Sequence, residues 1–185
     1  MFNKIIPLSF AFSFLFFINV NAQLAVSDKV SSEDYDLDLM KQLVTDSINS
    51  YRATGGGEAL GLDDVLSQAA NDQSDFMTKD AAVGLEQGKA AKKTTGKRVR
   101  YYGGSSTGSE EVVFYIPCGK SKDQYTYGKV VSDMMLKLMK NKKNASILLN
   151  KTYVYDGVGA TMDPSGKKLY VSIVVGTEDA ITKGK

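Results

Sequence analysis

Apolar side chains recur every three or four positions in three stretches of the chain, which is the spacing of an amphipathic helix. Hydroxyl and acidic residues open the first two stretches, where they can cap free backbone N–H groups. The predicted helices cover residues 33–52, the segment from Asp63 or Asp64 to about Met77, and residues 127–138, with a short helical turn over 147–149.

Four shorter runs are rich in β-branched and aromatic residues, which predicts strands. Two of them, residues 99–102 and 111–116, are separated by a glycine-rich loop. The other two, residues 153–162 and 168–175, are joined by Asp163-Pro164-Ser165-Gly166, a sequence typical of a tight turn. Helices come first, strands pair late and no repeat is present, so we expect one α+β layered domain.

The first 22 residues have the pattern of a secretory signal peptide. Lys4 provides a positive start, residues 5–20 are mainly apolar, and small residues allow cleavage after Ala22. The alternative is a membrane anchor, but the apolar run is shorter than the roughly 20 residues of a spanning helix. We therefore expect a secreted or periplasmic protein without stable membrane insertion after leader cleavage. Its segments would be a loose arm at 23–32, a domain at 33–178 and a tail at 179–185.

Composition excludes several kinds of chemistry. The chain has no histidine and one cysteine, so a Ser-His-Asp triad, a Cys-His dyad and a histidine-ligated zinc site cannot be built from it. We expect no metal and no cofactor. The 23 basic and 21 acidic residues nearly balance, which argues against nucleic acid as a partner.

Several short motifs, in order and at matching spacing, resemble the CAP superfamily of cysteine-rich secretory, antigen-5 and pathogenesis-related proteins. The similarity extends roughly from Leu37 to Gly176 and implies a three-layer α-β-α sandwich with a small, mainly antiparallel sheet and a cleft on one side. The matching segments are Asn49–Arg52 ("N-x-x-R"), Ser109–Val112 ("G-E-N-I"), Leu138–Asn144 ("W-M-x-S-x-x-H"), Ile147–Asn150 ("N-I-L-N") and Gly157–Gly159 ("G-V-G").

The chain departs from the family pattern where the family cleft often carries two histidines and two acids that can hold zinc. The second histidine position is Asn144, and the first falls within residues 82–86, which contain no histidine. The resemblance therefore implies a divergent bacterial member whose ligand cleft retains Glu110 and Asn144 but not the metal ligands.

Three functions remain open. The first is a non-catalytic domain that binds a lipid, an envelope glycan or a protein through its cleft or surface. The second is a carboxylate-based hydrolase of envelope glycan or peptide, with Glu110 as general base. The third is a structural surface protein without a ligand. Neighbouring residues of a strand point to opposite faces, so only one of Glu110 and Glu111 can enter a cleft; family position favours Glu110 and leaves Glu111 in solvent.

Two further features have alternative interpretations. Lys92, Lys93, Lys97, Arg98 and Arg100 form a basic segment that either meets an anionic partner or is a solvated loop. The single cysteine, Cys118, is either a reactive thiolate favoured by nearby lysines or a semi-buried residue without a role. For the core, the apolar stripes select Tyr51, Leu66, Met134, Leu138 and Val158.

Overall fold

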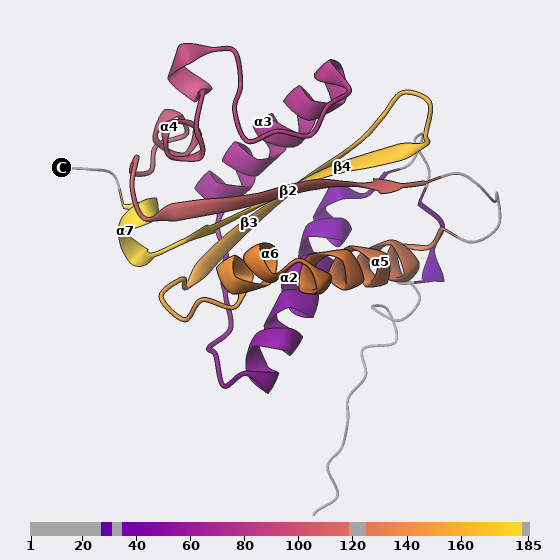
Figure 1. Cartoon of the computed structure of the whole chain (residues 1–185), viewed down its shortest axis with the longest axis horizontal. Helices are drawn as coiled ribbons and strands as arrows, with labels where there is room; N and C mark the ends of the chain where they lie inside the picture. The colour runs from indigo at the N-terminus through magenta and orange to yellow at the C-terminus, as the bar shows by residue number, and fades with distance from the viewer. Residues whose placement is uncertain (1–26, 31–34, 119–124, 183–185) are drawn as a thin grey trace, which may run out of the picture.

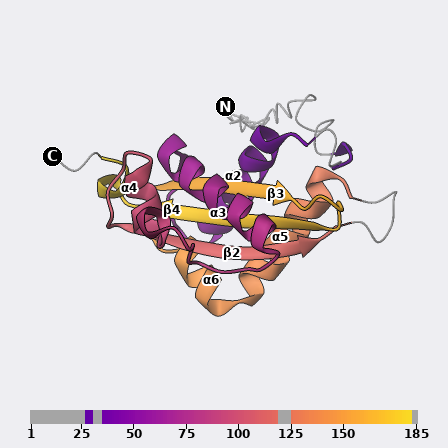
Figure 2. The same ribbon diagram turned by 90° about the horizontal axis from the view of Figure 1, so that it is seen from above.

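The computed structural model describes residues 27–30, 35–118 and 125–182. They form a four-stranded sheet between two layers of helices (Figures 1 and 2), which confirms the three-layer α+β prediction. The strands are β1 (Gly61–Leu62), β2 (Ser109–Pro117), β3 (Tyr155–Met162) and β4 (Lys168–Gly176). The helices are α2 (Leu37–Thr54), α3 (Asp64–Asp80), η1 (Ala90–Lys92), α4 (Thr95–Tyr101), α5 (Tyr127–Lys140), α6 (Lys142–Leu148) and α7 (Glu178–Ile181).

The sheet has the order β1-β3-β4-β2. Strand β4 lies in the centre and pairs antiparallel with β3 and β2, while the two residues of β1 run parallel to β3. The predicted turn between β3 and β4 is confirmed: Gly166 has a φ of 67°, and its N–H donates to the Asp163 carbonyl at 2.9 Å.

The second helix begins at one of its two predicted caps, and the first begins later than predicted. Asp63 is the cap of α3, and its carboxylate accepts from the Leu66 N–H at 2.9 Å. This resolves the choice between Asp63 and Asp64. Asp36 caps α2 in the same way, so the first predicted helix begins at Leu37. The proposed start at residues 31–34 lies outside the described residues, as does the predicted leader.

The two faces of the sheet carry separate clusters of buried side chains. Helices α2, α5 and α6 cover one face, where side chains of the strands such as Phe114 join the larger cluster. Helices α3 and α4 cover the other face, over the smaller cluster (Figure 1). The prediction of the core is confirmed for Leu66, Met134, Leu138 and Val158, none of which is exposed. It is wrong for Tyr51, which is 40% exposed. Tyr51 lies beside the buried stripe of α2, on the flank that faces α5.

Helix α3 lies unusually close to β3 because Gly157 and Gly159 have no side chain. A Cβ at Gly157 would collide with the backbone of Leu66 and Ser67, and one at Gly159 would collide with Ala70. The family-like Gly157-Val158-Gly159 segment therefore allows a helix to rest directly on the sheet, while Val158 points into the opposite core.

The prediction of a strand at 99–102 is wrong, because these residues belong to α4 and its end. Thr94 caps that helix, and Arg98 and Val99 are both buried against the rest of the molecule. A run of only four residues cannot distinguish a helical from an extended period, and here the tertiary contacts decide.

The ends of the described chain are attached to the domain. The Val30 N–H donates to the Tyr125 carbonyl at 2.7 Å, and Lys29 forms a bridge with Thr126. Helix α7 crosses the expected domain boundary at residue 178 and buries Ala180. Within the described ranges, no helix combines the length and hydrophobicity needed to cross a membrane.

Candidate functional site

The two adjacent acids of β2 do point to opposite faces, but the buried one is Glu111. Its carboxylate is buried and accepts from the hydroxyls of Ser172 and Thr95, each at 2.7 Å, and from the Arg98 guanidinium. Glu110 is exposed on the other face. The expectation that Glu111 is solvated is therefore wrong, because the strand turns this side chain under α4.

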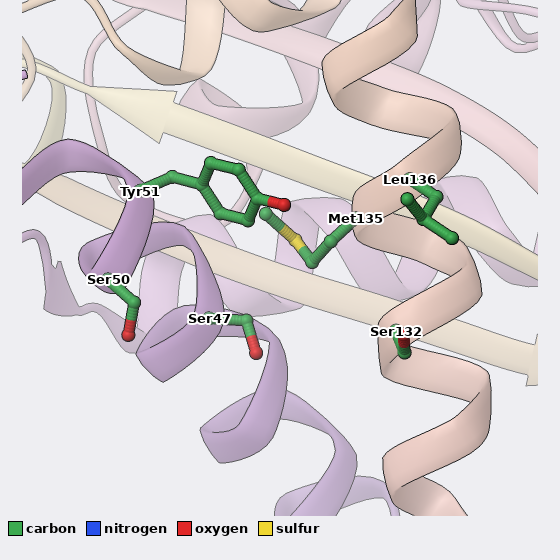
Figure 3. Close-up of a pocket in the computed structure, with 6 residues that line it drawn as sticks. All are labelled: Ser47, Ser50, Tyr51, Ser132, Met135 and Leu136. Atoms are coloured by element: carbon green, nitrogen blue, oxygen red, sulfur yellow. The ribbon is translucent and has the colours of Figure 1, made fainter. Parts of the chain in front are cut away.

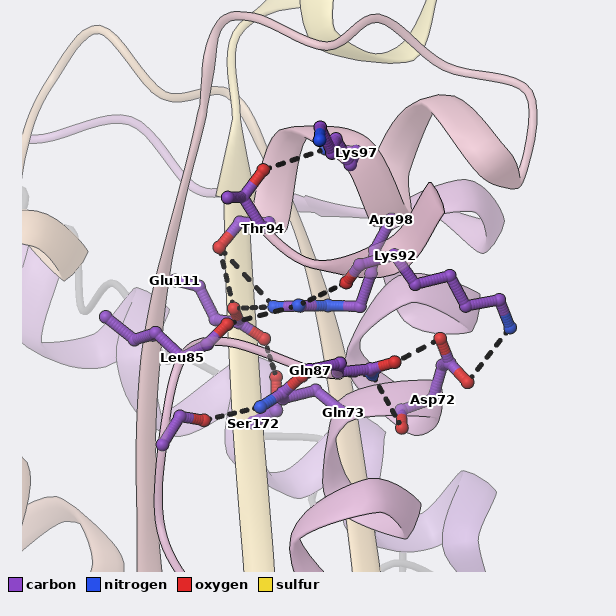
Figure 4. Close-up of polar contacts among 12 residues, drawn as sticks. Asp72, Gln73, Leu85, Gln87, Lys92, Thr94, Lys97, Arg98, Glu111 and Ser172 are labelled. Carbon is purple, nitrogen blue, oxygen red and sulfur yellow. Dashed lines mark hydrogen bonds and ion pairs between the residues drawn. The ribbon is translucent and has the colours of Figure 1, made fainter. Parts of the chain in front are cut away.

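Arg98 is the partner that makes this burial possible (Figure 4). It is completely buried and also donates to the carbonyls of Leu85 and Lys92, both at 3.1 Å. The assignment of Arg98 to an anion-binding surface is thus wrong: its charge is directed inward. Burial raises the pKa of Glu111, while the Arg98 charge and the hydroxyl donors act in the opposite direction.

Side-chain amides hold the loop at 82–86, where the resemblance places the first cleft histidine. Gln73 of α3 donates to the Gly84 carbonyl, and Gln87 donates to Gln73 at 3.1 Å and to the Asp72 carbonyl at 3.2 Å (Figure 4). These side-chain amides are neutral, and the network ends at the Asp72 carboxylate, which accepts from Gln87 at 3.4 Å.

The residues expected to form the cleft, Glu110 and Asn144, lie on the face covered by α6. Asn144 is half-buried in the first turn of α6. Burial of the Tyr153 hydroxyl and its interaction with the Glu110 carboxylate both raise the pKa of that tyrosine. In the described part of the chain, no hydrogen bond joins Glu110 to Asn144.

These residues do not fit zinc, the metal associated with the family cleft. Asn144 supplies a neutral amide, and zinc sites use thiolate, imidazole and carboxylate ligands. Within the described ranges, no three His, Cys, Asp or Glu side chains are grouped so that they could hold a metal ion.

The "N-x-x-R" pair fixes the backbone instead of facing a ligand. The Asn49 side chain accepts from the Leu60 N–H at 2.7 Å and donates to the Leu60 carbonyl at 3.0 Å. Arg52 is only 2% exposed. Its guanidinium donates to the backbone carbonyls of Glu58 (2.7 Å), Leu148 (2.8 Å), Asn150 (2.9 Å) and Tyr153 (3.0 Å). Arg52 thereby ties α2 to the connection between α6 and β3.

One buried acid lacks such a partner. Asp156 of β3 is completely buried beneath α2 and accepts from the Thr45 hydroxyl at 2.9 Å, but its other carboxylate oxygen has no hydrogen-bond partner. Burial raises the pKa of Asp156 to about 7. Sequence reasoning missed this residue, since an acid beside a glycine in a closing strand is typical of a turn.

Cys118 does not have the environment of a reactive thiolate. It is 6% exposed, and burial raises its pKa to about 11. The thiol packs in the core and donates weakly to the Ile116 carbonyl at 3.6 Å. Lys120 and Lys122, which the hypothesis invoked, lie outside the described residues.

A surface groove runs between α2 and α5 (Figure 3). It has a volume of about 260 Å³ and is lined by Ser47, Ser50, Tyr51, Ser132, Met135 and Leu136. The Tyr51 ring extends from α2 towards Met135, and Leu136 is 52% exposed. Such an exposed leucine beside an exposed tyrosine leaves apolar surface in contact with water.

A second pocket, of about 380 Å³, lies on the other side of Leu136. Its lining includes Pro117, Tyr125, Asp133, Lys137 and Lys140. We refer to the two pockets that share Leu136 together as the α5 groove. Sequence reasoning missed it, although apolar residues at 134–136 and 138–139 already cover more of a helix than one buried stripe requires.

Most of the chain matches the model of one protein family. Residues 45–175 match the cysteine-rich secretory protein (CAP) family, and since this is more than half of the chain, the protein belongs to that family. Among curated proteins, none matches the chain.

Solved structures show the same fold at low sequence identity. An outer surface protein from Borrelia burgdorferi is 12% identical with a TM-score of 0.57, over 74% of this chain and 90% of that one. The CAP domain of enterococcal PrgA is 15% identical with a TM-score of 0.58, over 90% and 73%. An extracellular SCP-domain protein from Bacillus anthracis is 16% identical with a TM-score of 0.57, over 78% and 45%.

Proposed function

We propose that this chain is an exported CAP domain that binds an amphipathic lipid, such as a fatty acid, in the α5 groove and catalyses no reaction. The observation that carries the proposal is the exposed apolar surface of Tyr51 and Leu136 on the two sides of a concave site. Exposed apolar surface gains free energy when a ligand covers it, at roughly 25 cal/mol per Å².

The groove also offers polar groups for the other end of such a ligand. Lys140 is exposed at the far pocket, and in the described ranges no acidic side chain pairs with it. Asp133, the acid that lines the same pocket, is already paired with Lys129 at 2.5 Å. Lys137 lines the same pocket and donates to the Tyr115 carbonyl at 2.8 Å, so its ammonium is held in place. An alkyl chain along Leu136 would bring a carboxylate within reach of these two lysines.

Export is supported by the predicted signal peptide and by the relatives. The Borrelia burgdorferi protein is named as an outer surface protein, and the Bacillus anthracis protein as extracellular. We expect the mature protein to begin at Gln23. N-terminal sequencing of protein recovered from its own envelope tests this, and recovery of a chain that retains residues 5–20 would contradict it.

Catalysis by Glu110 finds less support than binding. A glycosidase needs two carboxyl groups on either side of the scissile bond. The neighbouring acid, Glu111, points to the opposite face and is bonded to Arg98, so it cannot serve as the second group. Release of fragments from envelope glycan or peptide by the native protein, abolished in Glu110→Gln, would establish the hydrolase instead.

Binding is tested by titrating the delipidated mature protein with palmitate and oleate in a calorimeter. We expect saturable binding that Leu136→Glu weakens at least tenfold, because the substitution places a charge in the apolar part of the groove. Val83→Glu is the matched control, since Val83 is 43% exposed and does not line either pocket. Absence of saturable binding by the native protein, or equal loss in the control, would overturn the proposal.

A further inference from the structure

We infer a second binding site, for an acidic sugar unit of a glycan, in a pocket formed by η1 and α4. The pocket has a volume of about 520 Å³ and is lined by Ala90, Ala91, Lys97, Arg100 and Tyr101. Its size is within the range of about 300–1,000 Å³ that is usual for small-ligand sites. Helix α4 lies on the same side of the sheet as α3, and α5 lies on the other side (Figure 1), so the site does not depend on the proposed lipid function.

The structure divides the basic segment into charges that are used internally and charges that are not. Arg98 is buried on Glu111, Lys92 donates to Asp72 at 3.1 Å, and Lys93 lies 3.6 Å from Glu86. By contrast, the ammonium of Lys97 and the guanidinium of Arg100 have no acidic partner within 4 Å among the described residues.

Helical spacing places these two cations on the pocket side of α4. Arg100 and Tyr101 follow Lys97 by three and four positions, so the three residues share one face of the helix. Arg98 and Val99 point into the protein instead. Lys97 and Arg100 therefore lie on the same side of α4 as the exposed ring of Tyr101. The guanidinium is suited to a bidentate hydrogen bond with a carboxylate.

The Tyr101 ring is held in a fixed position while remaining accessible. It packs edge-on against Tyr102, with 5.1 Å between the ring centroids and an angle of 79° between the planes. The Lys92 ammonium lies 4.2 Å from its centroid and is itself held by Asp72, and the Lys89 ammonium lies 5.7 Å from the same centroid. Even so, 52% of Tyr101 is exposed, so part of an ordered aromatic side chain is accessible to a ligand.

These parts together select the chemistry of the ligand. Ala90 and Ala91 leave room beside the ring for a bulky flat group, and the C–H face of a pyranose packs well on an aromatic ring. Lys97 and Arg100 would then pair with a carboxylate attached to the sugar ring, as in a uronic acid. Nucleic acid fits less well, because the 23 basic and 21 acidic residues nearly balance and give little net attraction for a phosphate backbone.

The test is calorimetric titration of the mature protein with oligogalacturonate, compared with the same oligosaccharide as its neutral methyl ester. We expect binding of the acid form, at least tenfold weaker binding of the ester, and weakening of the acid form with added salt. The double variant Lys97→Gln/Arg100→Gln should lose at least tenfold in affinity. Tyr101→Ala should weaken binding of the acid form by a similar factor. Tyr101→Phe should bind as the native protein does, because the aromatic ring is retained.

The matched control is Lys142→Gln/Lys143→Gln, which removes two adjacent exposed charges from α6 on the opposite side of the sheet. It should bind the acid oligosaccharide as the native protein does. Equal affinity for acid and ester, or equal affinity of the two double variants, would overturn the inference.

Tighter binding of single-stranded oligonucleotides or of anionic phospholipid vesicles that depends on Lys97 and Arg100 would also overturn it. Palmitate binding should be unchanged in the Lys97→Gln/Arg100→Gln variant, so failure here is distinguishable from failure of the lipid proposal.

Discussion

On the face of the sheet covered by α2, α5 and α6, large aliphatic, aromatic and sulfur-containing side chains fill the space between helices and strands. On the face covered by α3 and α4, the apolar cluster is small and includes two alanines, and glycines let the backbones approach closely. Each face also buries an acid. Glu111 is paired with Arg98 and two hydroxyls, whereas Asp156 has a single hydroxyl donor and an unpaired oxygen.

This difference shows two ways in which a small domain accommodates a buried carboxyl group. Under α4, burial raises the pKa of Glu111, but the Arg98 charge and three hydrogen-bond donors oppose that rise, so the carboxyl group and Arg98 together replace apolar packing. Under α2, burial favours the neutral form instead, and the pKa of Asp156 rises to about 7. The first acid is satisfied by donors from α4 and β4, while the second is left with one hydroxyl donor.

The largest expected effect comes from breaking the ion pair on the α4 face. Glu111→Ala should destabilise the protein by about 3–5 kcal/mol, because it leaves the Arg98 charge buried without a partner. Urea unfolding followed by circular dichroism measures this. The double variant Arg98→Met/Glu111→Leu should recover most of the loss. A double variant as unstable as Glu111→Ala would show that hydrogen bonds to neighbouring groups, not the pair itself, stabilise this face.

Apolar truncation should weaken both faces. Leu138→Ala on the α5 side and Leu66→Ala on the α3 side should each reduce the free energy of unfolding by about 2–5 kcal/mol, through lost transfer free energy and an unfilled cavity. Both side chains are completely buried. Denaturant unfolding tests this, and losses under about 0.5 kcal/mol at both sites, the range usual for surface changes, would contradict the arrangement of the helices.

The buried acid of the α2 face should make stability fall as pH rises. The folded-state pKa of Asp156 is about 7, above its ordinary value of 3.8, so the folded protein binds more protons between these values. Its contribution to stability is thus greatest below about pH 4 and is lost as pH rises to about 7. Asp156→Asn removes this dependence.

The measurement is the difference in unfolding free energy between Asp156→Asn and the native protein at several pH values. Relative to its value at pH 4, this difference should shift in favour of the variant by on the order of 2–4 kcal/mol at pH 8. Asp163→Asn is the control with the opposite sign: burial acts to raise the pKa of Asp163, but hydrogen bonds from the backbone N–H groups of Lys168 and Lys167 outweigh it and lower that pKa. A constant difference for Asp156→Asn would contradict the raised pKa.

The smallest effect on stability is expected at the surface between α2 and α5, where Tyr51 lies. Tyr51→Ala should change the free energy of unfolding by no more than about 0.5 kcal/mol, since Tyr51 is 40% exposed. The same substitution should weaken palmitate binding several-fold if the α5 groove is the lipid site. Thermal unfolding and calorimetry on one variant thereby separate the residue's role in the groove from any role in the core.

Local patterns predicted most of the elements because their physical causes are local. The helical stripes and the cap at Asp63 depend on residues within a few positions of one another, and so does the turn at Asp163–Gly166. The cap of α2 at Asp36 was not predicted, because residues 31–34 offer the same kinds of polar side chain. The segment at 99–102 was misassigned because four residues are too few to show a helical period, and contacts with distant residues bury Val99. The two-residue β1 exists only because β3 pairs with it.

The sequence by itself determined the order of the layers, the family and the absence of histidine chemistry. It also predicted that Glu110 and Glu111 point to opposite faces, because alternation along a strand is a local property. Only the tertiary structure decided that Glu111 is the buried acid, that Arg98 turns inward to meet it while Lys97 and Arg100 stay outside, and that Tyr51 borders a groove. Those outcomes depend on which helix covers each face of the sheet, and hence on contacts between residues far apart in the chain.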